Sequence, residues 1–122
     1  MIKEERKLSR RRRKAKFHDL CDETREVARL YFRAFDSGVP QNGRRDLNMA
    51  IENREKGSSE TNSLFIARIE DAFKSLDTDS KRIINNDFFF NNYKFWWLEL
   101  YSTSTYYRLK RVAMCRFLNS LD

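Results

Sequence analysis

Apolar residues recur every three or four positions along several stretches of the chain, which is the spacing of one face of an α-helix. The first stretch covers residues 17–35, and Gly38 and Pro40 follow it in the segment DSGVPQNG. These two residues end the predicted helix, because glycine tolerates positive φ and proline cannot continue a helix. The apolar and small positions on its predicted inner face are Phe17, Leu20, Cys21, Thr24, Val27, Ala28, Tyr31, Ala34 and Phe35.

The same spacing predicts further helices over residues 44–56, 64–76, 91–100 and 104–118, and another after the polar break DTDS at residues 77–80. GSSETN, at residues 57–62, is typical of a loop or a helix N-cap. No strand-like alternation or internal repeat is visible, so the predicted fold class is all-α, a small helical bundle. The inward positions of the central helices are Leu47, Ala50 and Ile51, then Leu64, Phe65, Ile66, Ile69, Ala72, Phe73 and Leu76, then Ile83, Ile84, Phe88 and Phe89.

Composition agrees with one helical domain, which we assign to residues 17–122 after a basic arm at residues 1–16. The 122 residues include three glycines and one proline, so few residues oppose helix formation. The two cysteines lack CxxC spacing, so we expect no disulfide framework and a cytoplasmic protein. No apolar run approaches the length of a membrane span, and we expect no membrane partner.

Charge is distributed unevenly. Residues 1–16 carry nine basic and two acidic side chains, giving +7, whereas residues 17–103 carry −3 and residues 104–122 carry +3. A basic patch near each end of an acidic body indicates a polyanionic partner. The arm is either a phosphate-binding segment or a solubilising terminus, and its basic residues after residue 9 are Arg10, Arg11, Arg12, Arg13, Lys14 and Lys16.

The C-terminal stretch YSTSTYYRLKRVAMCRFLNSLD, residues 101–122, combines a hydroxyl cluster with basic residues. Ser102 or Thr103 can cap a helix whose predicted inner stripe is Tyr106, Leu109, Ala113 and Phe117. Short polar side chains at a helix start permit close approach to a nucleic-acid groove, and basic residues reach phosphates or guanine edges. The sequence therefore predicts a helix-turn-helix; a solvated helix that closes a bundle is the alternative. The residues expected to support this helix are Phe95, Trp96, Leu98 and Leu100, and those expected outward are Thr103, Ser104, Thr105, Tyr107, Arg108 and Arg111.

From Ile69 to Leu118 the order of segments resembles that of the fourth region of bacterial sigma factors. The segments that carry the resemblance are KSLDTDSKRII, NNDFFFNNY and a turn of small residues. STSTYYRLKRVAMCRFL is also similar to the end of ArpU-type phage transcriptional regulators, and closer still to a family of small mollicute proteins. Where many members have glycine in the turn, this chain has Tyr101 and Ser102. In the supporting helix before this turn, members usually have a sequence of the Glu-Glu-Ile-Ala type, whereas this chain has Trp96 and Trp97.

The resemblance implies a helix-turn-helix at about residues 69–120, sequence-specific binding of double-stranded DNA in transcription, and RNA polymerase as a further partner. It implies that bases or phosphates are contacted by Thr103, Ser104, Thr105, Tyr107 and Arg108, and phosphates by Lys110 and Arg111.

Other chemistry is less well supported. The aromatic run FFFNNYKFWW favours core packing over stacking on unpaired bases, and an exposed Trp97 would indicate a protein interface. His18, Cys21 and Asp22 have the spacing of half a metal site, but the chain has no second histidine. No nucleophile, P-loop or carboxylate constellation is visible, so we expect no enzyme, metal or cofactor. The alternative function is a non-enzymatic adaptor that binds a protein, with nonspecific nucleic-acid contact by its arm.

Overall fold

The computed structural model describes residues 15–34, 47–48, 51, 64–91 and 93–122. This part of the chain is helical and contains no strand, which confirms the predicted class. Leu47, Asn48 and Ile51 are also helical. The elements are α2 (Phe17–Arg33), α4 (Leu64–Lys74), α5 (Thr78–Ile84), a π-helix η1 (Asn85–Phe89) and α6 (Thr103–Leu121).

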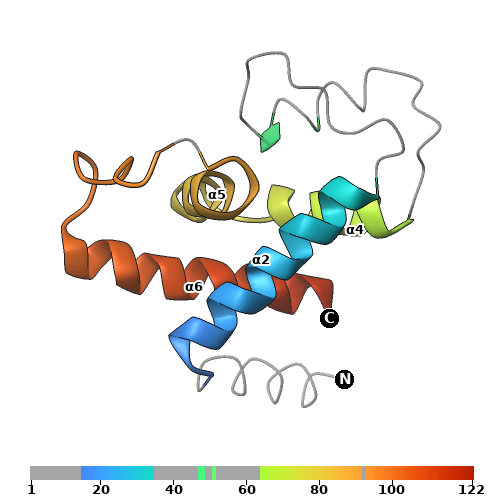
Figure 1. Cartoon of the computed structure of the whole chain (residues 1–122), viewed down its shortest axis with the longest axis horizontal. Helices are drawn as coiled ribbons and strands as arrows, with labels where there is room; N and C mark the ends of the chain where they lie inside the picture. Colours follow the sequence, from blue (N-terminus) through green and yellow to red (C-terminus); the bar gives the residue numbers. More distant parts are fainter. Residues whose placement is uncertain (1–14, 35–46, 49–50, 52–63, 92) are drawn as a thin grey trace.

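Helix α6 is the element on which the others assemble. It contacts α2, α4 and α5. Figure 1 shows α2 crossing α6 obliquely, α5 lying above α6 and seen along its axis, and α4 near the C-terminal end of α6. The core therefore surrounds the C-terminal half of α6, and its N-terminal half extends toward the edge of the molecule.

Helix α2 buries one stripe, as its periodicity predicts. Leu20, Thr24, Ala28 and Tyr31 are buried, at intervals of three and four residues. The Thr24 hydroxyl donates to the Leu20 carbonyl at 2.8 Å, so its polar atom is satisfied within the helix. The Tyr31 hydroxyl donates to the buried carboxylate of Glu70 on α4 at 2.8 Å. A polar contact inside the core thus fixes the position of α2 against α4.

The start of α4 differs from its predicted pattern. Leu64 and Phe65 were expected to face inward, but they are 83% and 41% exposed. Both belong to the first turn, and the buried face of the helix begins at Ile66 and continues through Ile69 and Phe73. The apolar character of Leu64 and Phe65 therefore does not bring them into the core.

Helix α5 passes directly into the π-helix η1. The Phe90 amide donates to the Asn85 carbonyl at 2.7 Å, an i to i+5 hydrogen bond that widens the turn by one residue. Phe88 and Phe89 are both buried, as predicted. The Asn85 side-chain oxygen accepts from the Leu47 amide at 2.7 Å, which attaches the segment around Leu47 to the wide turn.

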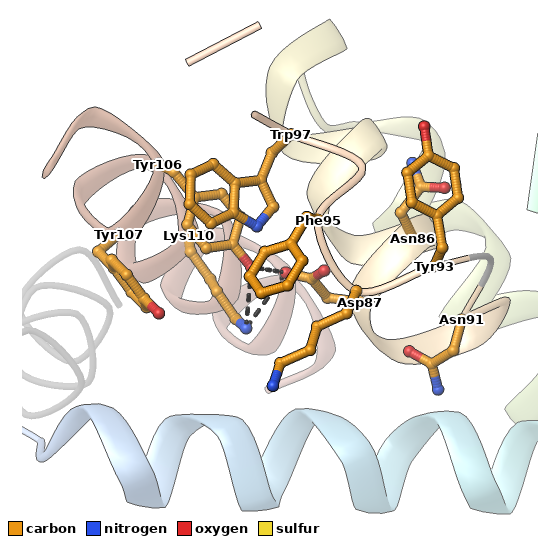
Figure 2. Close-up of a pocket in the computed structure, with 10 residues that line it drawn as sticks. Asn86, Asp87, Asn91, Tyr93, Phe95, Trp97, Tyr106, Tyr107 and Lys110 are labelled. Atoms are coloured by element: carbon orange, nitrogen blue, oxygen red, sulfur yellow. Dashed lines mark hydrogen bonds and ion pairs between the residues drawn. The ribbon is translucent and has the colours of Figure 1, made fainter. Parts of the chain in front are cut away.

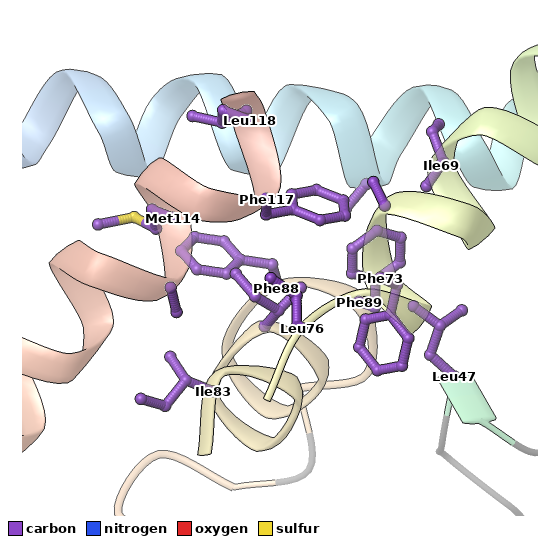
Figure 3. Close-up of a cluster of buried hydrophobic side chains, with 14 of the residues drawn as sticks. Leu47, Ile69, Phe73, Leu76, Ile83, Phe88, Phe89, Met114, Phe117 and Leu118 are labelled. Atoms are coloured by element: carbon purple, nitrogen blue, oxygen red, sulfur yellow. The ribbon is translucent and has the colours of Figure 1, made fainter. Parts of the chain in front are cut away.

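The core is built from aromatic and branched side chains of every described helix. Figure 3 shows Phe117 of α6 beside Phe73 and Phe89. The ring centroids of Phe89 and Phe117 lie 5.9 Å apart, and those of Tyr31 and Phe89 lie 5.5 Å apart, both edge to face. Such arrangements add to the stabilisation from burial alone.

The helix predicted over residues 91–100 is wrong. Described residues 94–100 form consecutive turns, and Phe95, Leu98 and Leu100 are more than half exposed. Trp96 and Trp97 are nevertheless both buried. Their burial therefore does not come from one face of a helix over residues 94–100, which the structure forms as turns. Helix α5 packs against α6 instead. The π-helix η1 contacts α6 through Asp87 and Phe89, and residues 90–102 connect η1 to α6.

Some predicted features lie outside the described residues. These are the break at residues 36–43, most of the helix over residues 44–56, the loop at residues 57–62, and Arg10 to Lys14 of the basic arm. The two inward residues of the 44–56 helix that are described, Leu47 and Ile51, are buried as predicted. Within the part of the chain that is described, no helix has the length and apolarity needed to cross a membrane.

We expect Phe117→Ala to lower the free energy of unfolding by about 3–5 kcal/mol, because it removes a fully buried ring. Phe95→Ala removes the same ring from a position that is 53% exposed, and should change stability by less than about 0.5 kcal/mol. Urea unfolding followed by circular dichroism measures both. Equal losses for the two variants would contradict the assignment of Phe117 to the core and Phe95 to the surface.

Candidate nucleic-acid interface

The first turn of α6 is capped by Ser102, one of the two predicted capping residues. The Ser102 hydroxyl oxygen accepts from the Thr105 amide at 3.3 Å, and its proton is donated to the Thr105 hydroxyl at 2.9 Å. Thr105 is partly buried, so it belongs to the cap more than to the outer surface. The cap fixes the direction in which the chain enters the helix.

The remaining outward residues of the first two turns lie where the sequence predicts. Thr103, Ser104 and Arg108 are exposed, and Tyr107 is 48% exposed. Because residues three and four apart share a helix face, Ser104 and Arg108 can contact the same ligand, as can Thr103 and Tyr107. The end of the molecule thus presents short hydroxyls, one phenol and one guanidinium.

The inner stripe of α6 is confirmed in most positions and is wider than predicted. Tyr106, Ala113 and Phe117 are buried, and Leu109 is partly buried. Met114, Cys115 and Leu118 are buried as well. The last turns therefore have neighbours on several sides, which the sequence period does not indicate, whereas the first turns are buried on one side.

Lys110 has a different environment from that of a phosphate contact. Its ammonium nitrogen lies 3.1 Å from a carboxylate oxygen of Asp87, and the two side chains are only 14% and 10% exposed. The same nitrogen lies 5.2 Å from the ring centroid of Phe88 and 5.5 Å from that of Tyr106. The ion pair and the rings account for Lys110, so we omit it from the interface.

Asp87 is the centre of this cluster, and the sequence analysis did not single it out. Its carboxylate accepts from the Trp96 indole nitrogen at 2.7 Å and from the Tyr106 hydroxyl, in addition to pairing with Lys110. Burial of the phenol, together with its hydrogen bond to this carboxylate, raises the pKa of Tyr106 well above its ordinary value. A signal was present in the sequence: an acid inside the run NNDFFF must be exposed or paired.

Arg111 is also held within the structure. Its guanidinium donates to the Ala15 carbonyl at 2.9 Å and lies 5.9 Å from the Phe17 ring centroid. The ring centroids of Phe17 and Tyr107 are 5.8 Å apart. The residues that directly follow the basic run in the sequence therefore lie against the first half of α6. Lys16, the one described basic residue of the predicted arm, is exposed there.

A pocket of about 410 Å³ adjoins the same part of α6. Figure 2 shows Tyr107 on one side of it, Tyr93 and the amides of Asn86 and Asn91 on the other, and Phe95 and Trp97 between them. Trp97 is 6% exposed, so it is not the exposed interface residue that the sequence alternative proposed. Tyr93 and Phe95 are the exposed aromatics of this run, which the prediction of core packing missed.

The predicted grouping of His18, Cys21 and Asp22 is only partly present. The two His18 ring nitrogens each lie 3.5 Å from a carboxylate oxygen, one of Asp19 and one of Asp22, and all three residues are exposed. Cys21 packs against the core instead, and burial raises the pKa of its thiol. Among the described residues, this group consists of one imidazole and two exposed carboxylates on the surface of α2.

Comparisons of the chain with protein-family models, with curated proteins and with solved structures found no match. The resemblance to sigma-factor region 4, to ArpU-type regulators and to the mollicute family therefore stays a prediction.

We expect Asp87→Asn to destabilise the protein by about 3–5 kcal/mol, because it leaves the Lys110 ammonium buried without its counter-charge. Adding Lys110→Met should recover part of the loss, since an apolar side chain then fills the space beside the rings. Asp79→Asn is the control, because Asp79 is 44% exposed. Guanidinium unfolding of the four proteins gives the comparison. A double variant no more stable than Asp87→Asn would contradict the ion-pair explanation.

Proposed function

We propose that this protein is a sequence-specific regulator of transcription that binds double-stranded DNA through the first turns of α6 and holds phosphates with its basic N-terminal arm. The observation that carries the proposal is the contact between Arg111 and the Ala15 carbonyl at 2.9 Å. Together with the Phe17–Tyr107 ring contact, it brings the end of the basic run beside Arg111 and Tyr107 of α6. Two features that are far apart in the sequence thus meet on one surface.

The first turn of α6 suits a groove or a phosphate on steric and electrostatic grounds. Thr103 and Ser104 are short and exposed, so the helix backbone can come close to a ligand there. The N-terminal amides of a helix carry partial positive charge and bind phosphate. Ser102 occupies one of these amides, that of Thr105. The others in the turn are available to an anion.

Arg108 is the side chain best suited to read a base. A guanidinium can donate two parallel hydrogen bonds to the O6 and N7 atoms of guanine in the major groove. Arg108 is exposed on the second turn, and Tyr107 lies next to it with half of its surface exposed. The buried C-terminal half of α6 anchors the helix, so a contact made by Arg108 does not require the helix to become ordered.

The bracing role in this proposal belongs to α5 and η1. Helix α5 packs against α6, and η1 contacts α6 through Asp87 and Phe89. The sequence assigned this role to residues 91–100, of which residues 94–100 form turns. The connection over residues 90–102 is longer than the three- or four-residue turn of an ordinary helix-turn-helix. We therefore place the recognition function in α6 and leave RNA polymerase as a partner implied by the resemblance alone.

We expect Arg108→Ala to reduce the preference for a cognate site over a scrambled one by about 1–3 kcal/mol, because a bidentate base contact is lost. Stability should change by less than about 0.5 kcal/mol. Arg116→Ala is the matched control: Arg116 is also exposed on α6, but it pairs with Asp77 at 3.1 Å, away from the first turns. A site selected from random duplexes, followed by competition with its scrambled version, measures the preference.

Preference that is unchanged by both Arg108→Ala and Tyr107→Ala would exclude base reading by this surface. Failure to select any consensus, with weak and salt-sensitive binding to all duplexes, would favour the adaptor alternative.

Deletion of residues 1–14 removes most of the predicted arm and keeps Ala15, the acceptor for Arg111. We expect weaker binding to every duplex and a smaller dependence on salt, since each lost phosphate contact makes the negative slope of log K against log salt shallower by about 0.9. Site preference should remain, because phosphate contacts carry no direct sequence information. The assay is fluorescence anisotropy over a salt series. If the truncated protein keeps its affinity but loses its site preference, then the arm reads the bases and α6 does not.

A further inference from the structure

The pocket beside α6 has an unusual lining for a surface hollow. Tyr93 is 68% exposed, Phe95 is 53% exposed and Tyr107 is 48% exposed, and all three line it. Aromatic side chains carry a large apolar surface that is normally buried. Here they come from two segments, the connection before α6 and α6 itself, and surround one space (Figure 2). The pocket is therefore bordered by exposed aromatic rings on which a flat ligand could stack.

One wall of the pocket is rigid. The Trp97 and Tyr106 rings are stacked with centroids 4.1 Å apart and an interplanar angle of 7°. Tyr106 is held by its hydrogen bond to Asp87. The ring centroids of Tyr106 and Tyr107 lie 4.9 Å apart, in an edge-to-face arrangement. The buried Trp97 and Tyr106 rings thus lie behind the exposed ring of Tyr107, and Trp97 also contacts the exposed ring of Phe95.

The polar groups around the rings are those that recognise a base joined to a phosphate. Asn86 and Asn91 both line the pocket, and the exposed side-chain amide of Asn91 can offer a donor and an acceptor to a base edge. Asn86 donates to the Arg82 carbonyl at 2.8 Å, which sets the direction of its amide. Lys94 is an exposed lining residue, and its ammonium nitrogen lies 5.4 Å from the Phe95 ring centroid.

The acidic group in the pocket does not oppose an anion. Asp87 is the one carboxylate among the described lining residues. It accepts from Trp96 and Tyr106 and is neutralised by Lys110. A phosphate near Lys94 therefore meets no uncompensated negative charge from this lining. The volume of about 410 Å³ falls in the range of about 300–1,000 Å³ that small-ligand sites occupy.

We propose that this pocket takes a single unpaired base of DNA, held against the exposed rings of Phe95, Tyr93 and Tyr107, with its linking phosphate at Lys94. The inference rests on the proposed function for the source of the nucleotide, because Tyr107 belongs to both the pocket and the outward surface of α6. A strand that leaves the duplex beside α6 supplies such a base directly. The protein thereby recognises a junction between double-stranded and single-stranded DNA.

The test uses full-length protein and three probes: a short oligodeoxyadenylate, the matching oligoriboadenylate, and the selected duplex. Quenching of the tryptophan fluorescence reports binding near Trp97. Phe95→Ala and Tyr93→Ala should each weaken oligodeoxyadenylate binding by about 5- to 150-fold, the range for loss of one stacked base. Duplex affinity should be unchanged. Leu98→Ala is the matched control, since Leu98 is 56% exposed on the same connection but is not a lining residue.

The outcomes separate the two proposals. Single-strand binding that depends on Phe95 and Tyr93, but not on Leu98, supports the pocket even if no duplex is preferred. No single-strand binding, or equal effects of Phe95→Ala and Leu98→Ala, overturns the pocket while duplex reading by Arg108 can still hold. Binding of the oligoriboadenylate alone overturns DNA as the source of the base. A melting curve for each variant confirms that it is folded, and unfolding of both Phe95→Ala and Tyr93→Ala would overturn their assignment to an open pocket.

Discussion

The shape of this molecule around the N-terminal half of α6 depends on the carboxylate of Asp87. It joins the π-helix to the connection before α6 through Trp96, and to α6 itself through Tyr106 and Lys110. A buried ion pair often stabilises a fold little more than apolar packing of similar volume would. The main effect of Asp87 is therefore on placement: it determines where Trp96, Tyr106 and Lys110 lie, and with them the entry into α6.

Helix α6 divides into two halves with different requirements. Its last turns are enclosed by α2, α4 and α5, and their side chains are fixed by packing. Its first turns are buried on one side only, where Tyr106 meets the Asp87 cluster. Outward residues such as Arg108 can consequently change with little effect on folding. A fold of this type can keep its core and acquire a different ligand preference through a few surface substitutions.

The sequence predicted what depends on local periodicity and failed where partners come from distant segments. The buried faces of α2 and α6 follow the 3.6-residue period, and both were predicted. Residues 91–100 also carry a high apolar content, but the two tryptophans are buried by Asp87 and Tyr106, which belong to other elements. Lys110 was expected to bind phosphate because it is basic and lies on α6, and its pairing with Asp87 is not visible in the helix pattern. DNA binding by Thr103, Ser104, Tyr107 and Arg108 stays a prediction that their exposure supports.

The i to i+5 hydrogen bond between Phe90 and Asn85 has a consequence for the evolution of this segment. A π-turn contains one residue more than the α-turn it replaces, and it is the form an insertion takes inside an existing helix. Removing one residue between Asn85 and Phe89 would narrow this turn to the i to i+4 hydrogen bond of an α-helix and shift the side chains of the turn relative to their partners. Asp87, Phe88 and Phe89 could not then keep their present neighbours. Chains that share this architecture should therefore keep the length of this segment more strictly than the identity of its outward residues.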